Sequence, residues 1–171
     1  LGIAWNNLNT QASGLKQSIS STADQMARLQ KDLTICLNHQ ASGYMLIFDV
    51  DDLAEINVER GRSYGDIILK KLAAVLSQLT KDWDYVYRLG SDRFAALLVG
   101  YKHEEVAEFC AQMKKQMDSY CSVSVGATCF EQEQDVMCVI QRAEIALKNA
   151  KNSYKTDLIF FFRNRLSGLL V

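Results

Sequence analysis

The chain has 171 residues, of which 49% are hydrophobic, and a formal net charge of −1. This length suffices for one domain with a hydrophobic core and one appended element, and the near-neutral charge argues against a basic surface for nucleic acid. No stretch approaches the roughly 18 consecutive apolar residues of a membrane span, so any membrane attachment would come from segments outside this sequence. Because the sequence begins at Leu1 rather than Met, we expect a fragment or a processed product.

The cysteine and histidine content excludes several kinds of site. Five cysteines are scattered without a C-x-x-C spacing, and only two histidines occur. A His-based zinc site and a His-dependent catalytic triad are therefore not expected. A domain of this size does not need disulfides, so we expect buried, reduced thiols in a cytosolic protein.

Residues 1–37 are predicted to form one long helix. Apolar residues recur there in steps of four and three, with Thr22 the one polar position, and the seam comprises Leu1, Trp5, Leu8, Ala12, Leu15, Ile19, Thr22, Met26, Leu29, Leu33 and Cys36. A narrow seam over five heptads is typical of a coiled coil. We therefore predict a homodimer paired through this helix. The alternative is a single amphipathic helix that packs against its own domain.

Residues 38–171 alternate between predicted strands and helices and form the globular domain. We expect strands at 44–50, 84–89, 94–100, 121–128 and 157–162, and helices at 52–60, 65–79, 103–118 and 136–151. Gly90 to Arg93 form a hairpin-type turn between two of the strands. The order βααββαβ, followed by a terminal helix and strand, predicts an α+β domain with one antiparallel-rich sheet and helices on a face.

Two of the predicted strands end in carboxylates. Asp49, Asp51 and Asp52 follow an apolar strand, and Asp92 lies in the hairpin turn. Two strands that each deliver an acid to one edge of a sheet can hold divalent cations, which serve phosphate chemistry. Arg93, however, places a positive charge beside the turn carboxylate.

Four segments in sequence order carry a family resemblance. They are Phe-Asp-Val-Asp at 48–51 with Ile56 and Asn57, Gly-Arg-Ser-Tyr-Gly-Asp at 61–66, Arg-Leu-Gly-Ser-Asp-Arg-Phe at 88–94, and Ser-Val-Gly at 124–126 with an alanine-rich helix that ends near Lys151. Over residues 36–160 this pattern resembles the GGDEF domain of diguanylate cyclases. The resemblance implies a ferredoxin-like βααββαβ domain of the nucleotidyl-cyclase type. In that family two GTP molecules are joined into cyclic di-GMP across a dimer interface, and long N-terminal helices carry signals to the domain.

The resemblance also implies roles for individual residues. Asp49 and Asp92, with the Val50 carbonyl, would hold two Mg²⁺ ions that polarise phosphoryl oxygens and activate a ribose hydroxyl. Asn57 and Asp66 match the residues that read the edge of guanine, and an acid suits the guanine N1 and amino donors. The structural alternative for Asp66 is an N-cap of its helix.

Basic residues are implied at two further places. Lys151 and Lys155 match the pair that neutralises the triphosphate, although both could be ordinary charges at a helix C-terminus. Lys81 and Asp84 occupy the position of the family's product-inhibition motif, where Lys cannot reproduce the bidentate contact of Arg with guanine. A solvated turn is the favoured interpretation of this second place.

Three departures from the family pattern argue against catalysis. One lies outside the signature turn: Ala54 stands where the family often has a phosphate-facing Lys, and Arg62 replaces the usual His. The other two lie in the turn. Ser91 replaces a glycine whose freedom lets the turn adopt positive φ and approach nucleotide. Arg93 replaces a glutamate, a change of two charge units close to the expected metals. One hypothesis is that Arg93 pairs with Asp92 or Asp49 and takes the place of the cation.

We therefore predict a degenerate GGDEF domain that acts as a dimerising, GTP-binding regulatory module of a cyclic di-GMP signalling protein. The alternatives are an active diguanylate cyclase and a purely structural interaction domain with a vestigial site. We expect a cytoplasmic domain, which a membrane-bound sensor would carry through segments outside this sequence. A phosphodiesterase domain could follow residue 171.

Overall fold

The structure, a computed structural model, describes residues 21–81, 85–131, 135–153, 158–162 and 165–169. In chain order the elements are α2 (Ser21–Asn38), β1 (Gly43–Val50), α3 (Leu53–Arg60), α4 (Arg62–Leu79), β2 (Tyr85–Arg88), β3 (Arg93–Val99), α5 (His103–Met117), β4 (Val123–Phe130), α6 (Val136–Asn152), β5 (Leu158–Phe162) and β6 (Arg165–Leu169). The helices and strands expected from residue 44 onward are present close to the expected bounds.

The described strands form one sheet in the order β2-β3-β1-β4-β5-β6. β1 lies in its middle and pairs antiparallel with both β3 and β4. β4 and β5 are parallel, and β6 adds antiparallel to β5 at the edge. β6 was not expected, because its short sequence includes Ser167 and Gly168 and has no run of strand-forming residues.

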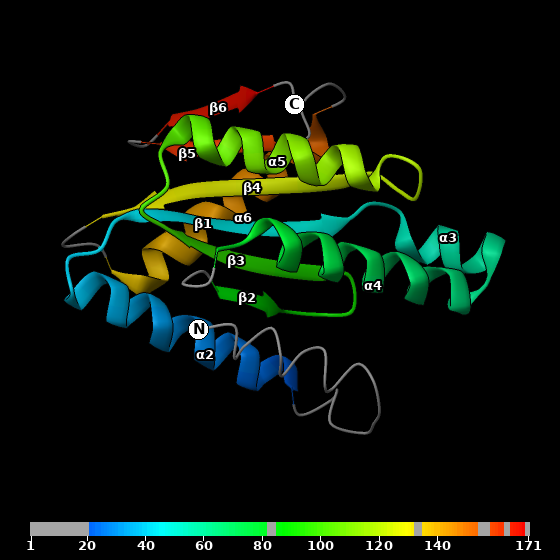
Figure 1. Cartoon of the computed structure of the whole chain (residues 1–171), viewed down its shortest axis with the longest axis horizontal. Helices are drawn as coiled ribbons and strands as arrows, with labels where there is room; N and C mark the ends of the chain where they lie inside the picture. Colours follow the sequence, from blue (N-terminus) through cyan, green and yellow to red (C-terminus); the bar gives the residue numbers. More distant parts are fainter. Residues whose placement is uncertain (1–20, 82–84, 132–134, 154–157, 163–164, 170–171) are drawn as a thin grey trace.

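Helices cover both faces of this sheet, whereas we expected them on a face (Figure 1). Every residue of β1 is buried. Leu46 and Phe48 belong to the core beneath α4 and α5, while Met45 and Ile47 belong to the core beneath α2 and α6. A central strand that is apolar on both sides must be covered on both sides, so the uninterrupted apolar run of β1 already carried this information.

The second half of the predicted N-terminal seam packs within the domain. Leu29 and Leu33 are fully buried and Cys36 is nearly so, in a cluster that includes Tyr87 and Ala95 of the sheet. For these three positions the coiled-coil prediction is wrong and the intramolecular alternative holds, because the sheet face already buries their side chains. Residues 1–20 lie outside the described residues, and the coiled coil stays a prediction there.

Helix α6 lies directly on β4. A Cβ atom at Gly126 of β4 would overlap the backbone of Ala143 and Leu147 in α6, so only glycine permits this approach. The alanines that face the sheet, Ala143 and Ala146, are fully buried. This contact fixes where the last turns of α6 meet the end of β1.

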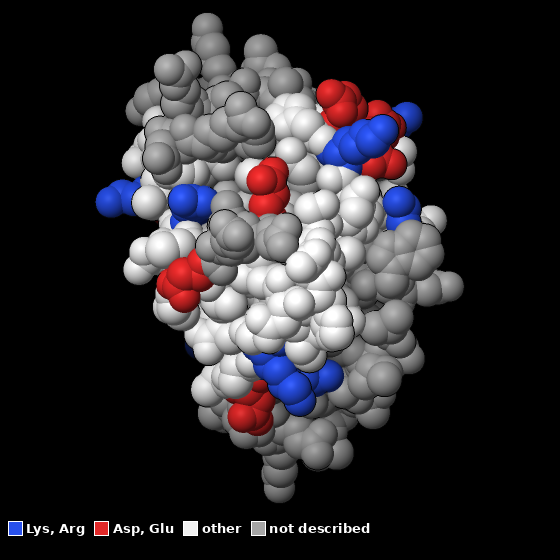
Figure 2. Space-filling model, turned by 90° about the vertical axis from the view of Figure 1, so that its left-hand side faces the viewer, with Lys and Arg blue, Asp and Glu red and all other residues white. Residues whose placement is uncertain are grey.

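The end of the sheet where β1, α5 and α6 begin is opposite to the end that carries the hairpin turn (Figure 1). Figure 2 shows the molecule from the end where β1, α5 and α6 begin. On this side positive and negative side chains are interspersed around a mainly uncharged centre. None of the described helices is long and apolar enough to span a bilayer.

One hydrogen bond joins α2 to the sheet, and we expect it to stabilise the fold. The hydroxyl of Tyr87, a fully buried residue of β2, donates to Oδ2 of Asp32 at 2.5 Å. Tyr87→Phe should lower the free energy of unfolding by about 1 kcal/mol, because Asp32 loses the hydrogen bond that the buried hydroxyl donates. Urea denaturation measures this change.

The matched control is Tyr85→Phe, which removes the hydroxyl of a half-buried ring stacked on Tyr87. Tyr85→Phe should lower the free energy of unfolding clearly less than Tyr87→Phe does. Equal stability of the two variants would contradict a stabilising role for the bond.

Candidate functional site

The site is centred on Asp49, at the end of the central strand. Asp49 continues the face of β1 that carries Met45 and Ile47, and it is only 3% exposed. In the antiparallel register its direct neighbour on β3 is Arg93, and on β4 it is Ser124. The hairpin thus brings position 93, the first residue of β3, opposite Asp49.

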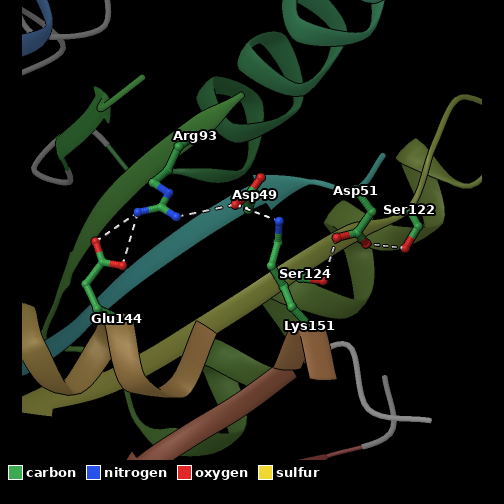
Figure 3. A network of polar contacts seen from close by, with 7 residues as sticks. All are labelled: Asp49, Asp51, Arg93, Ser122, Ser124, Glu144 and Lys151. Atoms are coloured by element: carbon green, nitrogen blue, oxygen red, sulfur yellow. Dashed lines mark hydrogen bonds and ion pairs between the residues drawn. The ribbon is translucent and has the colours of Figure 1, made fainter. Parts of the chain in front are cut away.

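Two cations contact the same oxygen of Asp49 (Figure 3). Lys151 Nζ lies 2.9 Å from Oδ2, and Arg93 Nη2 lies 3.5 Å from it. Arg93 Nη1 also donates to both carboxylate oxygens of Glu144 at 3.1 Å. Among the described residues, the buried Oδ1 of Asp49 has no hydrogen-bond partner. The hypothesis that Arg93 pairs with Asp49 is confirmed as geometry.

The hairpin turn is held by a half-buried arginine. Arg88 Nε donates to the Gly90 carbonyl at 3.1 Å, and Nη2 donates to the Ser91 carbonyl at 3.2 Å. Burial lowers the pKa of Arg88, and the nearby Asp66 carboxylate partly offsets this effect. Ser91 has no positive φ, so its side chain causes no backbone strain in this turn.

Asp92 meets the strand through its backbone. The Asp92 carbonyl accepts a hydrogen bond from the Val50 amide at 3.0 Å. Asp92 as a whole is half-buried. The side chain that the structure brings into contact with Asp49 from this turn is that of Arg93.

The two candidate guanine-reading residues lie on α3 and α4. The side chain of Asn57 packs against Gly65, where a Cβ atom would overlap it, and its buried Oδ1 has no partner in the described part of the chain. Asp66 is exposed. The N-cap alternative for Asp66 is wrong, because α4 begins at Arg62 and its N-cap is Gly61.

A second acidic residue of the cluster, Asp51, is held by two serines (Figure 3). Ser122 donates to Oδ2 at 2.6 Å and Ser124 to Oδ1 at 2.7 Å. Burial, and then the Asp51 carboxylate, raise the pKa of the neighbouring Cys121 to about 11. This thiol is therefore protonated at neutral pH and a poor nucleophile.

All five cysteines are free, as expected. The expectation that they are buried holds for Cys36 and Cys110, whereas Cys121 and Cys129 are half-buried and Cys138 is exposed.

The remaining predicted residues lie apart or outside the described chain. Lys81 Nζ lies 4.2 Å from the centroid of the Tyr101 ring, in a groove that also contains Glu104 and Glu108. These carboxylates disfavour an anionic ligand there. Asp84 and Lys155 are outside the described residues.

A larger groove, of about 430 Å³, borders the Asp49 network. It is lined by Arg93, Glu144, Ile145, Leu147, Lys148, Lys151 and Asn152. Three of these residues are cationic and one is a carboxylate. The groove can therefore accept an anion more readily than a cation.

The comparison with known families rests on this fold and this site. The family model for "Diguanylate cyclase, GGDEF domain" matches residues 25–157. The chain belongs to the GGDEF family. The resemblance seen in its four segments is thus confirmed, and the match includes most of α2.

Curated relatives of this GGDEF domain are diguanylate cyclases. Diguanylate cyclase DgcZ of Escherichia coli K12 is 24% identical over 127 residues, covering 68% of this chain and 43% of the relative. Diguanylate cyclase DosC of the same strain is 31% identical over 118 residues, covering 63% of this chain and 26% of the relative. The chain thus spans less than half the length of either relative.

Solved structures show the same fold. The GGDEF domain of DgcB from Caulobacter crescentus, in complex with c-di-GMP, has a TM-score of 0.74 at 16% identity, covering 82% of this chain and 90% of that one. The active GGEEF domain of a diguanylate cyclase from Vibrio cholerae has a TM-score of 0.72 at 16% identity, covering 85% and 97%. The predicted ferredoxin-like α+β cyclase-type fold is confirmed.

The Mg²⁺ ions that the resemblance implies do not fit the arrangement of this GGDEF domain. Oδ2 of Asp49 already has two cationic partners. A divalent ion on Oδ1 would lie within a few ångströms of both, with a Coulomb cost even at substantial screening. No group of three or more His, Cys, Asp or Glu side chains in the described ranges could hold a metal ion.

Sequence reasoning missed Glu144 altogether, and it missed the contacts of two residues that it did name, Arg88 and Asp51. Glu144 lies seven positions before Lys151, so helical periodicity alone puts both on one side of α6. Arg88 was noted only as part of the signature, and its contact with the turn carbonyls was not expected. Asp51 gave no signal that would distinguish its serine partners from solvent.

We expect Lys151 to compensate the buried charge of Asp49. Lys151→Met should lower the free energy of unfolding by about 1–2 kcal/mol, because the carboxylate keeps only the more distant Arg93. The double variant Asp49→Asn, Lys151→Met should recover most of this loss, since an amide needs no cation. Urea denaturation of both variants measures the difference.

Lys148→Met serves as the control, because Lys148 is exposed and lies one turn earlier on α6. Its stability should stay within about 0.5 kcal/mol of the parent. If the double variant is as unstable as Lys151→Met, charge compensation is not the role of Lys151.

Proposed function

We propose that this GGDEF domain is catalytically impaired and acts as a dimerising, GTP-binding regulatory module of a cyclic di-GMP signalling protein. The observation that carries the proposal is the position of Arg93. It lies opposite Asp49 and contacts it, at the place where the family has a carboxylate. Lys151, the implied phosphate ligand, also contacts Asp49.

Nucleotide binding is supported by the residues that the site retains. Asn57 and Asp66 match the family's guanine-reading positions, and Gly65 leaves the room that the Asn57 side chain occupies. The groove beside Arg93 carries a surplus of positive charge that suits phosphate groups. We also propose a cytoplasmic location, which a membrane-bound sensor would share.

An active diguanylate cyclase is the second candidate function. It is favoured by the turn itself, because Ser91 is accommodated without positive φ and Asp92 is retained. Activity would require Arg93 and Lys151 to leave Asp49 and a metal to replace them. A vestigial, purely structural domain would account for Arg93 but not for the retained guanine-reading positions.

The test of catalysis is chromatographic detection of cyclic di-GMP after incubation with GTP and Mg²⁺. We expect no product from the parent protein, because Arg93 places a positive charge against Asp49, close to the expected metals. The variant Ser91→Gly, Arg93→Glu should make product if the rest of the pocket is intact. Product from the parent would overturn the impaired-enzyme proposal.

Two controls make this assay specific. Adding Asp49→Ala to the Ser91→Gly, Arg93→Glu variant should abolish its product, since the buried carboxylate is then gone. Circular dichroism of each variant shows that the fold is retained. Silence from both the parent and the repaired variant would favour a site that has decayed beyond the turn.

Dimerisation is proposed through the seam positions that precede Leu29. We expect Leu15→Asp to convert the dimer into a monomer in light scattering, because a carboxylate on the seam must be desolvated in the paired state. The matched control Gln17→Asp adds the same charge off the seam and should leave the mass unchanged. A dimeric Leu15→Asp variant would contradict pairing through this helix.

A further inference from the structure

The groove beside the Asp49 network is lined by cationic side chains whose N–H donors are only partly engaged by Asp49 and Glu144. The side chains of Arg93 and Lys151 are 35% and 38% exposed, and exposed Lys148 completes the cationic lining. A guanidinium has five N–H donors and an ammonium three. The contacts with Asp49 and Glu144 therefore leave donors of both groups free to face a ligand in the groove.

The carboxylates behind these cations keep them in place. Glu144 accepts two bonds from one nitrogen of Arg93, and Asp49 holds Lys151 at 2.9 Å. Cations positioned in advance by buried or half-buried partners lose less conformational entropy when an anion binds. The groove is thus already arranged for phosphate oxygens, which Arg and Lys bind through charge-assisted hydrogen bonds.

A metal-bound nucleotide suits this groove less well than a free one. Mg²⁺ on the phosphates would cancel part of the negative charge that the three cations attract. It would also bring two further positive charges close to Arg93 and Lys151, with a repulsive interaction at a few ångströms. In this structure the arginine and the lysine are the cationic partners of Asp49.

We infer that this domain binds the triphosphate of a guanine nucleotide without a divalent metal ion, with Arg93, Lys148 and Lys151 as the direct phosphate ligands. The inference rests on the nucleotide binding proposed above and assigns how the site holds the phosphates. Arg93 is then a phosphate-binding residue and not only a substitution that brings a positive charge close to the expected metals.

The test is isothermal titration calorimetry of the whole chain with GTP, once in EDTA and once in excess Mg²⁺. We expect binding in EDTA to be at least as tight as binding in Mg²⁺. Arg93→Gln and Lys148→Met should each weaken binding in EDTA by about tenfold or more, as loss of a charged hydrogen bond does. ATP in place of GTP should bind more weakly, because the contacts of Asn57 and Asp66 with guanine are lost.

Lys115→Met is the matched control, since Lys115 is an exposed lysine of α5 on the other face of the sheet. It should bind GTP like the parent. Lys148 is exposed as well, so Lys148→Met keeps the test valid if Arg93→Gln is poorly folded.

Three results would overturn the inference, and they differ in what they leave standing. Binding that requires Mg²⁺ removes metal independence and leaves the regulatory GTP-binding proposal intact. Binding in EDTA that neither Arg93→Gln nor Lys148→Met weakens places the ligand elsewhere. No binding in either buffer removes both the inference and the GTP-binding half of the proposed function, while the cyclase assay still decides catalysis on its own.

Discussion

The buried carboxylate of Asp49 is the constraint around which the polar end of this molecule is organised. It is the last but one residue of a strand whose residues are all buried. Its charge must therefore be compensated by groups that reach it from neighbouring elements. Arg93 arrives from the paired strand and Lys151 from α6. Removing the compensation would leave a charge in the core, whereas a metal ion could supply it only if both cations moved away. The chemistry open to this site therefore depends on which cation accompanies Asp49.

Packing far from the site decides where these partners lie. Gly126 allows α6 to rest on the backbone of β4, and the buried alanines of α6 keep the helix at that short separation. Glu144 and Lys151 are two turns apart on this helix, so its placement sets both contacts at once. The close packing of α6 on β4 thus determines which charged side chains of α6 reach Arg93 and Asp49.

Helix α2 is connected to the hairpin turn through the short strand β2. Asp32 accepts a hydrogen bond from the Tyr87 hydroxyl. Arg88, which follows Tyr87 in β2, donates to the carbonyls of the turn. Leu29 and Leu33 complete this contact by burying the helix on the sheet. α2 is therefore part of the domain's core, and the match of the family model from residue 25 agrees with that position.

Much of this protein followed from local patterns in its sequence. Alternating and continuous apolar runs identified β1, β3 and β4, helical periodicity identified α4, α5 and α6, and the four motifs in order identified the family. Such signals are short-range: each depends on residues within one or two turns or strands. The seam of α2 was also read correctly as an apolar stripe, but a stripe does not say what covers it. Whether Leu33 meets a second helix or its own sheet depends on which surface is nearest after folding.

The tertiary structure alone decided the partners of the site. That Arg93 faces Asp49 requires the pairing register of β1 and β3, and that Lys151 reaches the same oxygen requires the approach of α6 to β4. The serines that hold Asp51 come from more than 70 positions along the chain. The sequence by itself determined which charges the domain carries, while the three-dimensional arrangement determined which of them neutralise one another, because charge compensation depends on distances of a few ångströms between segments far apart in the chain.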